Sequence, residues 1–148
     1  MSELTEADAR KPFCEAVARL GYRAELPEDS PTVIRTAMSG LACLLTIGIG
    51  GRFTLGKLYC GFAVDEDSPA DLETINTFNR KYRFGKLTLD DDMDYALEMD
   101  FLVDAKKEDI QSYMDTVLML WEGLLGEFKS QFLGSLGSSI SASQETNG

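Results

Sequence analysis

The segment between residues 32 and 64 most constrains the fold, because it is rich in β-branched and aromatic residues and is punctuated by glycines. This composition is typical of β-strands, and the pair Gly50-Gly51 suits a two-residue hairpin turn. If these two glycines form the turn, residues 49 and 52 face each other across the hairpin. The segment therefore predicts two or three antiparallel strands joined by tight turns.

This pairing of the two strands places alternate side chains on two faces of the sheet, because successive side chains of a strand point to opposite sides. It places Cys43 opposite Leu58, so that Cys60 is a diagonal neighbour about 7 to 8 Å away, which disfavours a disulfide. Both cysteines are then expected to be small buried hydrophobic residues. The first face carries Leu41, Cys43, Leu45, Ile47, Thr54, Leu58, Cys60 and Phe62. The second face carries Leu44, Phe53, Leu55 and Tyr59.

Three segments show the periodicity of amphipathic helices. The first covers about residues 5–20, where Thr5 and Asp8 can form a capping box and Pro12 is expected to interrupt or bend the helix. The second is expected to begin at Ser68, which would cap a helix with proline in its first position. Its apolar face carries Leu72, Ile75, Phe78 and Tyr82. The third runs from about residue 107 to 132 and has a broad apolar stripe.

The stretch from residue 82 to 104 alternates between apolar and polar side chains on either side of an acidic turn. The carboxylates of this stretch include Asp90, Asp91, Asp92, Asp94 and Glu98. A calcium loop of the EF-hand type that begins at Asp90 would need glycine and glutamate where Tyr95 and Phe101 stand. We therefore interpret the turn as the solvated tip of a hairpin between two strands. A weak divalent-cation site, and less readily an acid pair made by Glu98 and Asp100, are the alternatives.

The charge balance excludes several classes of function. The chain has 14 Lys and Arg against 25 Asp and Glu, and a net charge of -11 disfavours contact with nucleic acid or anionic membranes. It has no histidine, so Ser-His-Asp and Cys-His catalysis are excluded, and its three cysteines show no CxxC spacing, so neither a disulfide framework nor a zinc knuckle is indicated. We expect no enzyme activity and no cofactor.

The longest mostly apolar run covers residues 41–49 and is far shorter than the roughly 20 residues of a membrane helix. The first residues also lack the apolar core of a signal peptide. A cytoplasmic location is therefore expected.

A basic cluster follows the second helix, where Arg80, Lys81, Arg83 and Lys86 alternate with Tyr82 and Phe84. We interpret these cations as the basic C-terminal end of the helix. There they interact favourably with the negative end of the helix dipole and can pair with the nearby aspartates. A binding site for an acidic partner is the first alternative. Nucleic-acid binding is less consistent with the net charge.

The stretch INTFNRKYRFGKLTLDDDMDYALEMDF at residues 75–101 resembles the YbjN-like family of bacterial sensory transduction regulators. The matching features are a helix that ends in FNR, a strand rich in aromatic residues, an acidic turn, the returning strand LEMDF and a long helix. The resemblance implies a fold like that of type III secretion chaperones. It also implies a non-enzymatic regulator or binding protein, and it attaches no catalytic residues to the pattern.

The periodicity and the resemblance agree on the fold class. We predict an α+β domain with an antiparallel sheet of about five strands, helices packed on one face, and the order α-β-β-β-α-β-β-α. This single domain is expected to span residues 1–133. Residues 134–148 are small and polar and are expected to form a flexible tail.

The predicted function is that of a regulatory or chaperone-like protein-binding domain that acts through its sheet and helix surfaces. Helices on one side cover only one face of a sheet that is apolar on both, so a second copy or a client protein would cover the other. A homodimer is therefore expected. The candidate binding residues are Leu44, Phe53, Leu55, Tyr59, Arg80 and Arg83. The alternative is a sensor of a small ligand or divalent cation that uses the acidic hairpin Asp90–Asp94.

Overall fold

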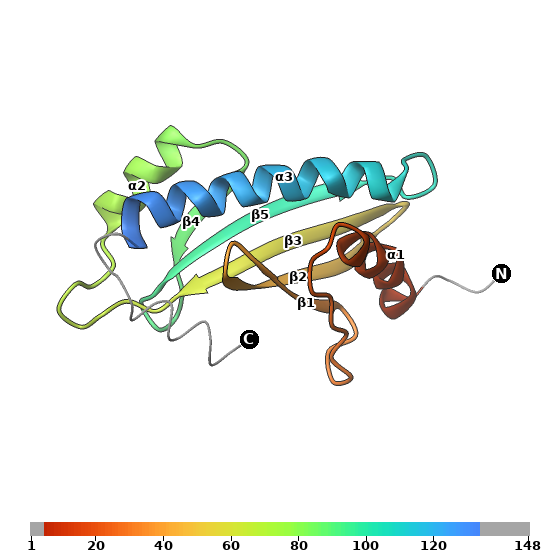
Figure 1. The fold of residues 1–148 in the computed structure, drawn as a ribbon, viewed down its shortest axis with the longest axis horizontal. Helices are drawn as coiled ribbons and strands as arrows, with labels where there is room; N and C mark the ends of the chain where they lie inside the picture. The colour runs from red at the N-terminus through yellow and green to blue at the C-terminus, as the bar shows by residue number, and fades with distance from the viewer. Residues whose placement is uncertain (1–4, 134–148) are drawn as a thin grey trace.

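A computed structural model describes residues 5–133 of the 148-residue chain, and the predicted tail at 134–148 lies outside the described residues. Five strands form one antiparallel sheet in the order β1-β2-β3-β5-β4 (Figure 1). The predicted α+β class and element order are confirmed. The elements are α1 (Glu6–Arg19), β1 (Val33–Met38), β2 (Leu41–Gly50), β3 (Phe53–Phe62), α2 (Leu72–Lys81), β4 (Gly85–Leu89), β5 (Tyr95–Val103), α3 (Ile110–Phe128) and a π-helical turn η1 (Lys129–Leu133).

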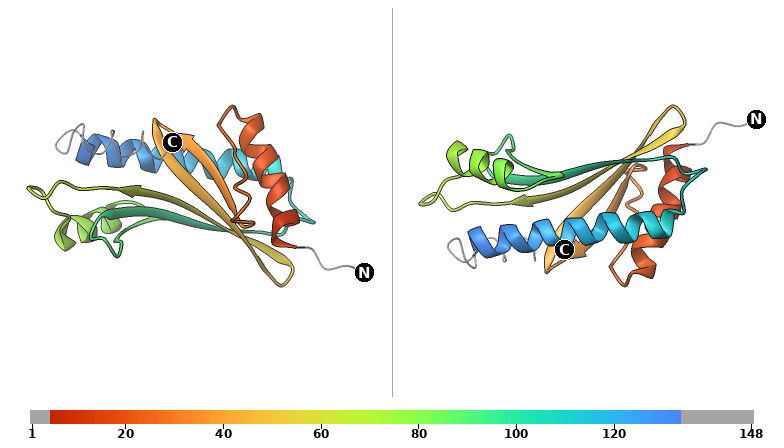
Figure 2. Two further views of the ribbon diagram at one scale, coloured as in Figure 1. Left: turned by 90° about the horizontal axis from the view of Figure 1, so that it is seen from below. Right: turned by 90° about the horizontal axis from the view of Figure 1, so that it is seen from above.

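The hydrophobic core lies between the sheet and its helices. Helices α1 and α3 lie on the same side of β3 and β5, and α3 runs along most of the length of the sheet (Figures 1 and 2). Phe13 of α1, Phe78 of α2 and Trp121 of α3 are fully buried in this core. Helix α2 also lies along the outer edge of β4, where the side-chain amide of Asn79 bonds the backbone N–H and C=O of Leu87 at 2.8 and 3.0 Å. This contact occupies an edge that would otherwise be open to another strand.

The hairpin between β2 and β3 turns one residue later than predicted. Gly50 pairs with Phe53, so the turn residues are Gly51 and Arg52, and the prediction that Gly50 and Gly51 form the turn is wrong. Gly51 has a φ of 65°, the left-handed region that the first position of such a turn requires and that glycine adopts without strain. One glycine is enough for this geometry, so Gly50 remains in the strand.

The later turn shifts the pairing of the two central strands. Leu44 pairs with Tyr59, and the next pair along the ladder places Cys43 opposite Cys60, not opposite Leu58 as predicted. Because the shift is two residues, no side chain changes face, and the eight residues predicted for the first face are all buried. Both cysteines are free thiols. The neighbouring Cys43 thiol, together with burial, raises the pKa of the Cys60 thiol, which donates to the Ala42 carbonyl at 3.3 Å.

Two helices begin where local capping places them. Thr5 caps α1 and accepts the N–H of Asp8 at 3.1 Å, as predicted, and the helix continues through Pro12 without the expected interruption. Helix α2 begins after Asp71, whose carboxylate accepts the N–H of Thr74 at 2.9 Å, so the predicted start at Ser68 is wrong.

The later start of α2 also changes which side chains it buries. Ile75, Phe78 and Tyr82 contact the core as predicted, but Leu72 stands in the first turn and is 71% exposed, so its predicted place on the apolar face is wrong. Helix α3 begins at Ile110, where Asp109 caps it, and is followed by the π-helical turn. It is therefore shorter than the predicted 107–132.

Two glycines inside α3 offer a test of the helix. Space is open where a Cβ would stand at Gly123 and at Gly126. Because glycine in a helix interior costs about 0.5–1 kcal/mol relative to alanine, Gly123→Ala and Gly126→Ala should each raise the free energy of unfolding by about that amount. Urea denaturation followed by circular dichroism measures the change. A loss of stability in both variants would contradict the exposed position of this face of α3.

Candidate functional site

One face of the sheet carries side chains that no helix covers, and we name it the open face. It consists of the outward residues of the three central strands, namely Leu44, Thr46, Gly48, Phe53, Leu55, Lys57, Tyr59, Glu98, Asp100 and Leu102. Leu44, Leu55 and Leu102 are 37, 43 and 52% exposed. Leu44 and Leu55 were predicted on this face, as were Phe53 and Tyr59, which are half-buried. Leu102 was missed, although the alternation along residues 95–103 could have indicated it.

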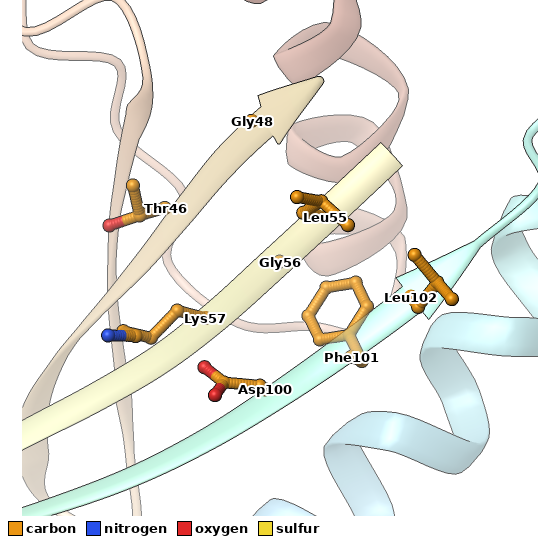
Figure 3. A pocket seen from close by; sticks show the side chains of 8 residues that line it. All are labelled: Thr46, Gly48, Leu55, Gly56, Lys57, Asp100, Phe101 and Leu102. Carbon is orange, nitrogen blue, oxygen red and sulfur yellow. The ribbon is translucent and has the colours of Figure 1, made fainter. Parts of the chain in front are cut away.

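A shallow groove of about 580 Å³ runs across the open face (Figure 3). Its lining comes from β2, β3 and β5 and consists of Thr46, Gly48, Leu55, Gly56, Lys57, Asp100, Phe101 and Leu102. Gly48 contributes no side chain beside Leu55, its partner across the ladder, and the Glu6 carboxylate of α1 lies 3.9 Å from where a Cβ of residue 48 would stand. One carboxylate and one ammonium line this groove, so it does not gather the acid pair that a hydrolase of sugars would need.

Opposite charges alternate beside the groove. The Glu98 carboxylate lies between two ammonium groups, 3.8 Å from Lys57 and 3.6 Å from Lys86. Asp100 is exposed and faces Lys57 across the β3–β5 ladder. Burial raises the pKa of the nearby Tyr59 hydroxyl, and the negative charges of Asp90 and Glu98 raise it further. The open face thus combines apolar side chains with charges of both signs, on a chain whose net charge is -11.

The acidic turn is the tip of the hairpin between β4 and β5. The Asp90 carboxylate accepts the N–H groups of Asp92 and Asp94 at 2.9 and 3.0 Å, and the Asp94 carboxylate accepts the N–H of Val64 at 3.0 Å. These carboxylates therefore fix the backbone of the turn. Within residues 5–133, no group of three or more acidic or thiol side chains is arranged to hold a metal ion. The hairpin interpretation accounts for the geometry, and nothing in it favours the cation sensor.

The basic cluster lies at the connection between α2 and β4, outside the open face. Lys86 pairs with Glu98, whereas the sequence suggested the aspartates of the turn as its partners. The Lys81 ammonium stands 5.3 Å from the centre of the Tyr82 ring. Across the described residues, no ion pair joins Arg80 or Arg83 to a carboxylate. The two candidate arginines are thus separate from the candidate leucines.

No helix between residues 5 and 133 has the length and apolar character needed to cross a bilayer.

Comparison with known proteins identifies the family. A crystal structure of YbjN, described as a putative transcription regulator from E. coli, matches the fold with a TM-score of 0.52 and 13% sequence identity. The match covers 87% of this chain and 96% of that one. No curated protein matches the chain. Residues 12–129, most of the chain, match a family described as "Putative bacterial sensory transduction regulator". The resemblance seen at residues 75–101 is therefore confirmed over a much longer stretch, and the chain belongs to the YbjN family.

Proposed function

We propose that this chain is a regulatory protein-binding domain, and that its open face is the contact surface for a second copy of itself in a homodimer. The observation that carries the proposal is the group of exposed leucines on the uncovered face, Leu44, Leu55 and Leu102. Single exposed apolar residues are common on monomers, but Leu55 and Leu102 pair directly across the ladder and both line the groove, which is typical of a binding surface. The family description, a regulator, is consistent with action through binding.

The charges of the open face favour a second copy as the occupant. Two copies that each carry a net charge of -11 repel each other at long range. The charged residues of the open face are Lys57, Glu98 and Asp100, and Arg35 and Lys86 lie beside it on the edge strands β1 and β4, so charges of both signs stand where the copies would touch. In a two-fold contact the same patch meets itself, so Lys57 of one copy can approach Asp100 of its partner.

The test is the oligomeric state of Leu55→Glu across a range of concentrations, measured by sedimentation equilibrium. A charge in the middle of a buried apolar contact should weaken the dimer at least about tenfold, since truncation of a central contact residue commonly costs more than 1 kcal/mol. Leu72→Glu is the matched control, because Leu72 is also an exposed leucine but lies on α2, away from the open face. It should dimerise like the wild type.

Two results would refute the proposal. One is a wild-type chain that stays monomeric at high micromolar concentration. The other is a folded Leu55→Glu variant, verified by circular dichroism, that dimerises as tightly as Leu72→Glu.

A further inference from the structure

Phe84 has an unusual backbone for a large aromatic residue. Its φ is 73°, in the left-handed region, and the N–H of Gly85 donates to the carbonyl of Arg83 at 2.9 Å across it. This hydrogen bond and this φ define a γ-turn of the rare, strained form. Glycine would adopt the conformation without strain, and bulky residues seldom do. Phe84 is nevertheless 71% exposed, so burial of its ring does not offset the strain.

The residues on either side of Phe84 are held firmly against the core. The Tyr82 ring packs against Phe78 with 4.6 Å between centroids, and its hydroxyl donates to the Glu127 carboxylate of α3 at 2.9 Å. A Cβ added at Gly85 would lie only 2.6 Å from Leu124, so the backbone there is close-packed on α3. The outward position of Phe84 is therefore set by packed neighbours, and its backbone is held in place in advance of any binding event.

Three cations stand close to Phe84 in the chain. Arg80 and Lys81 stand in the last turn of α2, and Arg83 directly precedes Phe84. All three are exposed, and neither guanidinium forms an ion pair with a carboxylate within residues 5–133. The chain has 25 acidic residues that could have neutralised them. The region thus combines an exposed aromatic ring with uncompensated cations on an otherwise acidic molecule.

We propose that Phe84, Arg80 and Arg83 form a docking site for an acidic segment of a partner protein. Guanidinium groups bind carboxylates through paired hydrogen bonds, and an aromatic ring beside arginine is a common centre of binding energy. An apolar side chain of the segment packs on the Phe84 ring while its neighbouring carboxylates contact the arginines. The site lies outside the open face, so it does not depend on the proposed homodimer.

Two features define how the segment binds. Because the Asn79 amide already occupies the outer backbone groups of Leu87, the segment is recognised by side chains and not by addition of a strand to β4. At physiological ionic strength, charges separated by more than about 8 Å are largely screened. The electrostatic interaction of a short acidic segment with this chain therefore depends more on the nearby arginines than on distant acidic residues. A nucleic acid, which is charged along its whole length, would also approach the acidic remainder of the surface.

The test uses a short fluorescein-labelled peptide of glutamate and aspartate with two central leucines, titrated with the full chain at physiological and at higher ionic strength and followed by fluorescence anisotropy. We expect saturable binding that weakens about tenfold in Phe84→Gly, because the ring is the central contact. Phe84→Gly should fold at least as stably as the wild type, since glycine relieves the strained φ. Arg80→Gln with Arg83→Gln should weaken binding and flatten its dependence on salt.

Two control variants determine whether peptide binding depends on this site in particular. Arg19→Gln removes a charge from the exposed end of α1 in the same way, and Leu55→Glu alters the open face, so both should bind the peptide like the wild type. Absence of saturable binding, or equal binding by a folded Phe84→Gly, would overturn the proposal. Equally tight binding of a single-stranded oligodeoxynucleotide would overturn the acidic protein as partner. Loss of self-association in Phe84→Gly would assign the site to a second copy and overturn it as well.

Discussion

Replacement of Phe128 by alanine is expected to lower the free energy of unfolding by about 3–5 kcal/mol, the usual cost of removing a large buried aromatic side chain. Phe128 is fully buried near the end of α3. Its ring stacks on Phe62 of β3 at 4.0 Å and meets Phe78 of α2 and Tyr95 of β5 at 6.2 and 6.0 Å between centroids. Its loss would leave a cavity where four elements meet. Guanidinium denaturation, followed through the single tryptophan, Trp121, measures the change.

Two other substitutions serve as controls for Phe128→Ala. Phe128→Leu fills much of the same space and should cost clearly less than Phe128→Ala. Met119→Ala changes another large side chain of α3, but Met119 is 66% exposed and its removal should alter stability by no more than about 0.5 kcal/mol. If Phe128→Ala cost no more than Met119→Ala, the aromatic cluster would not be what holds α3 to the sheet.

The faces of the sheet could be predicted from the sequence, whereas the register could not. Alternation places Leu45 inward and Leu44 outward whichever residues form the turn, as long as the pairing shifts by an even number. The register depends on whether Gly50 or Gly51 takes the left-handed position, and both are glycine. The contact between Cys43 and Cys60 follows from that choice alone, so local composition could not reveal it.

The start of α2 was missed for a similar reason. Both Ser68 and Asp71 are good capping residues, and local preference does not decide between them. The backbone N–H of Asp71 donates to the hydroxyl of Tyr95 at 3.3 Å, a contact with a strand that comes much later in the chain. This contact ties Asp71 to the sheet where the helix begins. As a result, Leu72 stands in the first turn and remains exposed.

The candidate surfaces were only partly visible in the sequence. Leu44 and Leu55 follow from alternation, but the groove requires β5 to lie between β3 and β4, an order that no local pattern encodes. The strained turn at Phe84 was also invisible, because a phenylalanine next to a glycine predicts positive φ at the glycine. Instead, a glycine is needed at position 85 because the backbone there packs closely against Leu124, and the positive φ is found at Phe84.

The second large effect is expected for Gly56→Ala, because Gly56, like Gly85, lies where there is no room for a side chain. Gly56 pairs with Phe101 across the β3–β5 ladder, and a Cβ added there would lie 2.0 Å from the far end of the Phe101 ring. The ring is held in place by Phe13 and Tyr113, whose centroids are 6.1 and 6.0 Å away. It must therefore move or push the strands apart, and Gly56→Ala should lower the free energy of unfolding by about 1–3 kcal/mol.

Phe101→Leu tests whether this contact is the cause, because leucine does not reach as far across the neighbouring strand. If the clash is the cause, Gly56→Ala should cost less in the Phe101→Leu background than in the wild type, with a coupling energy of about 1 kcal/mol or more from the double-mutant cycle. Urea denaturation of the four proteins measures it. Additive costs would mean that Gly56 is needed for its backbone alone.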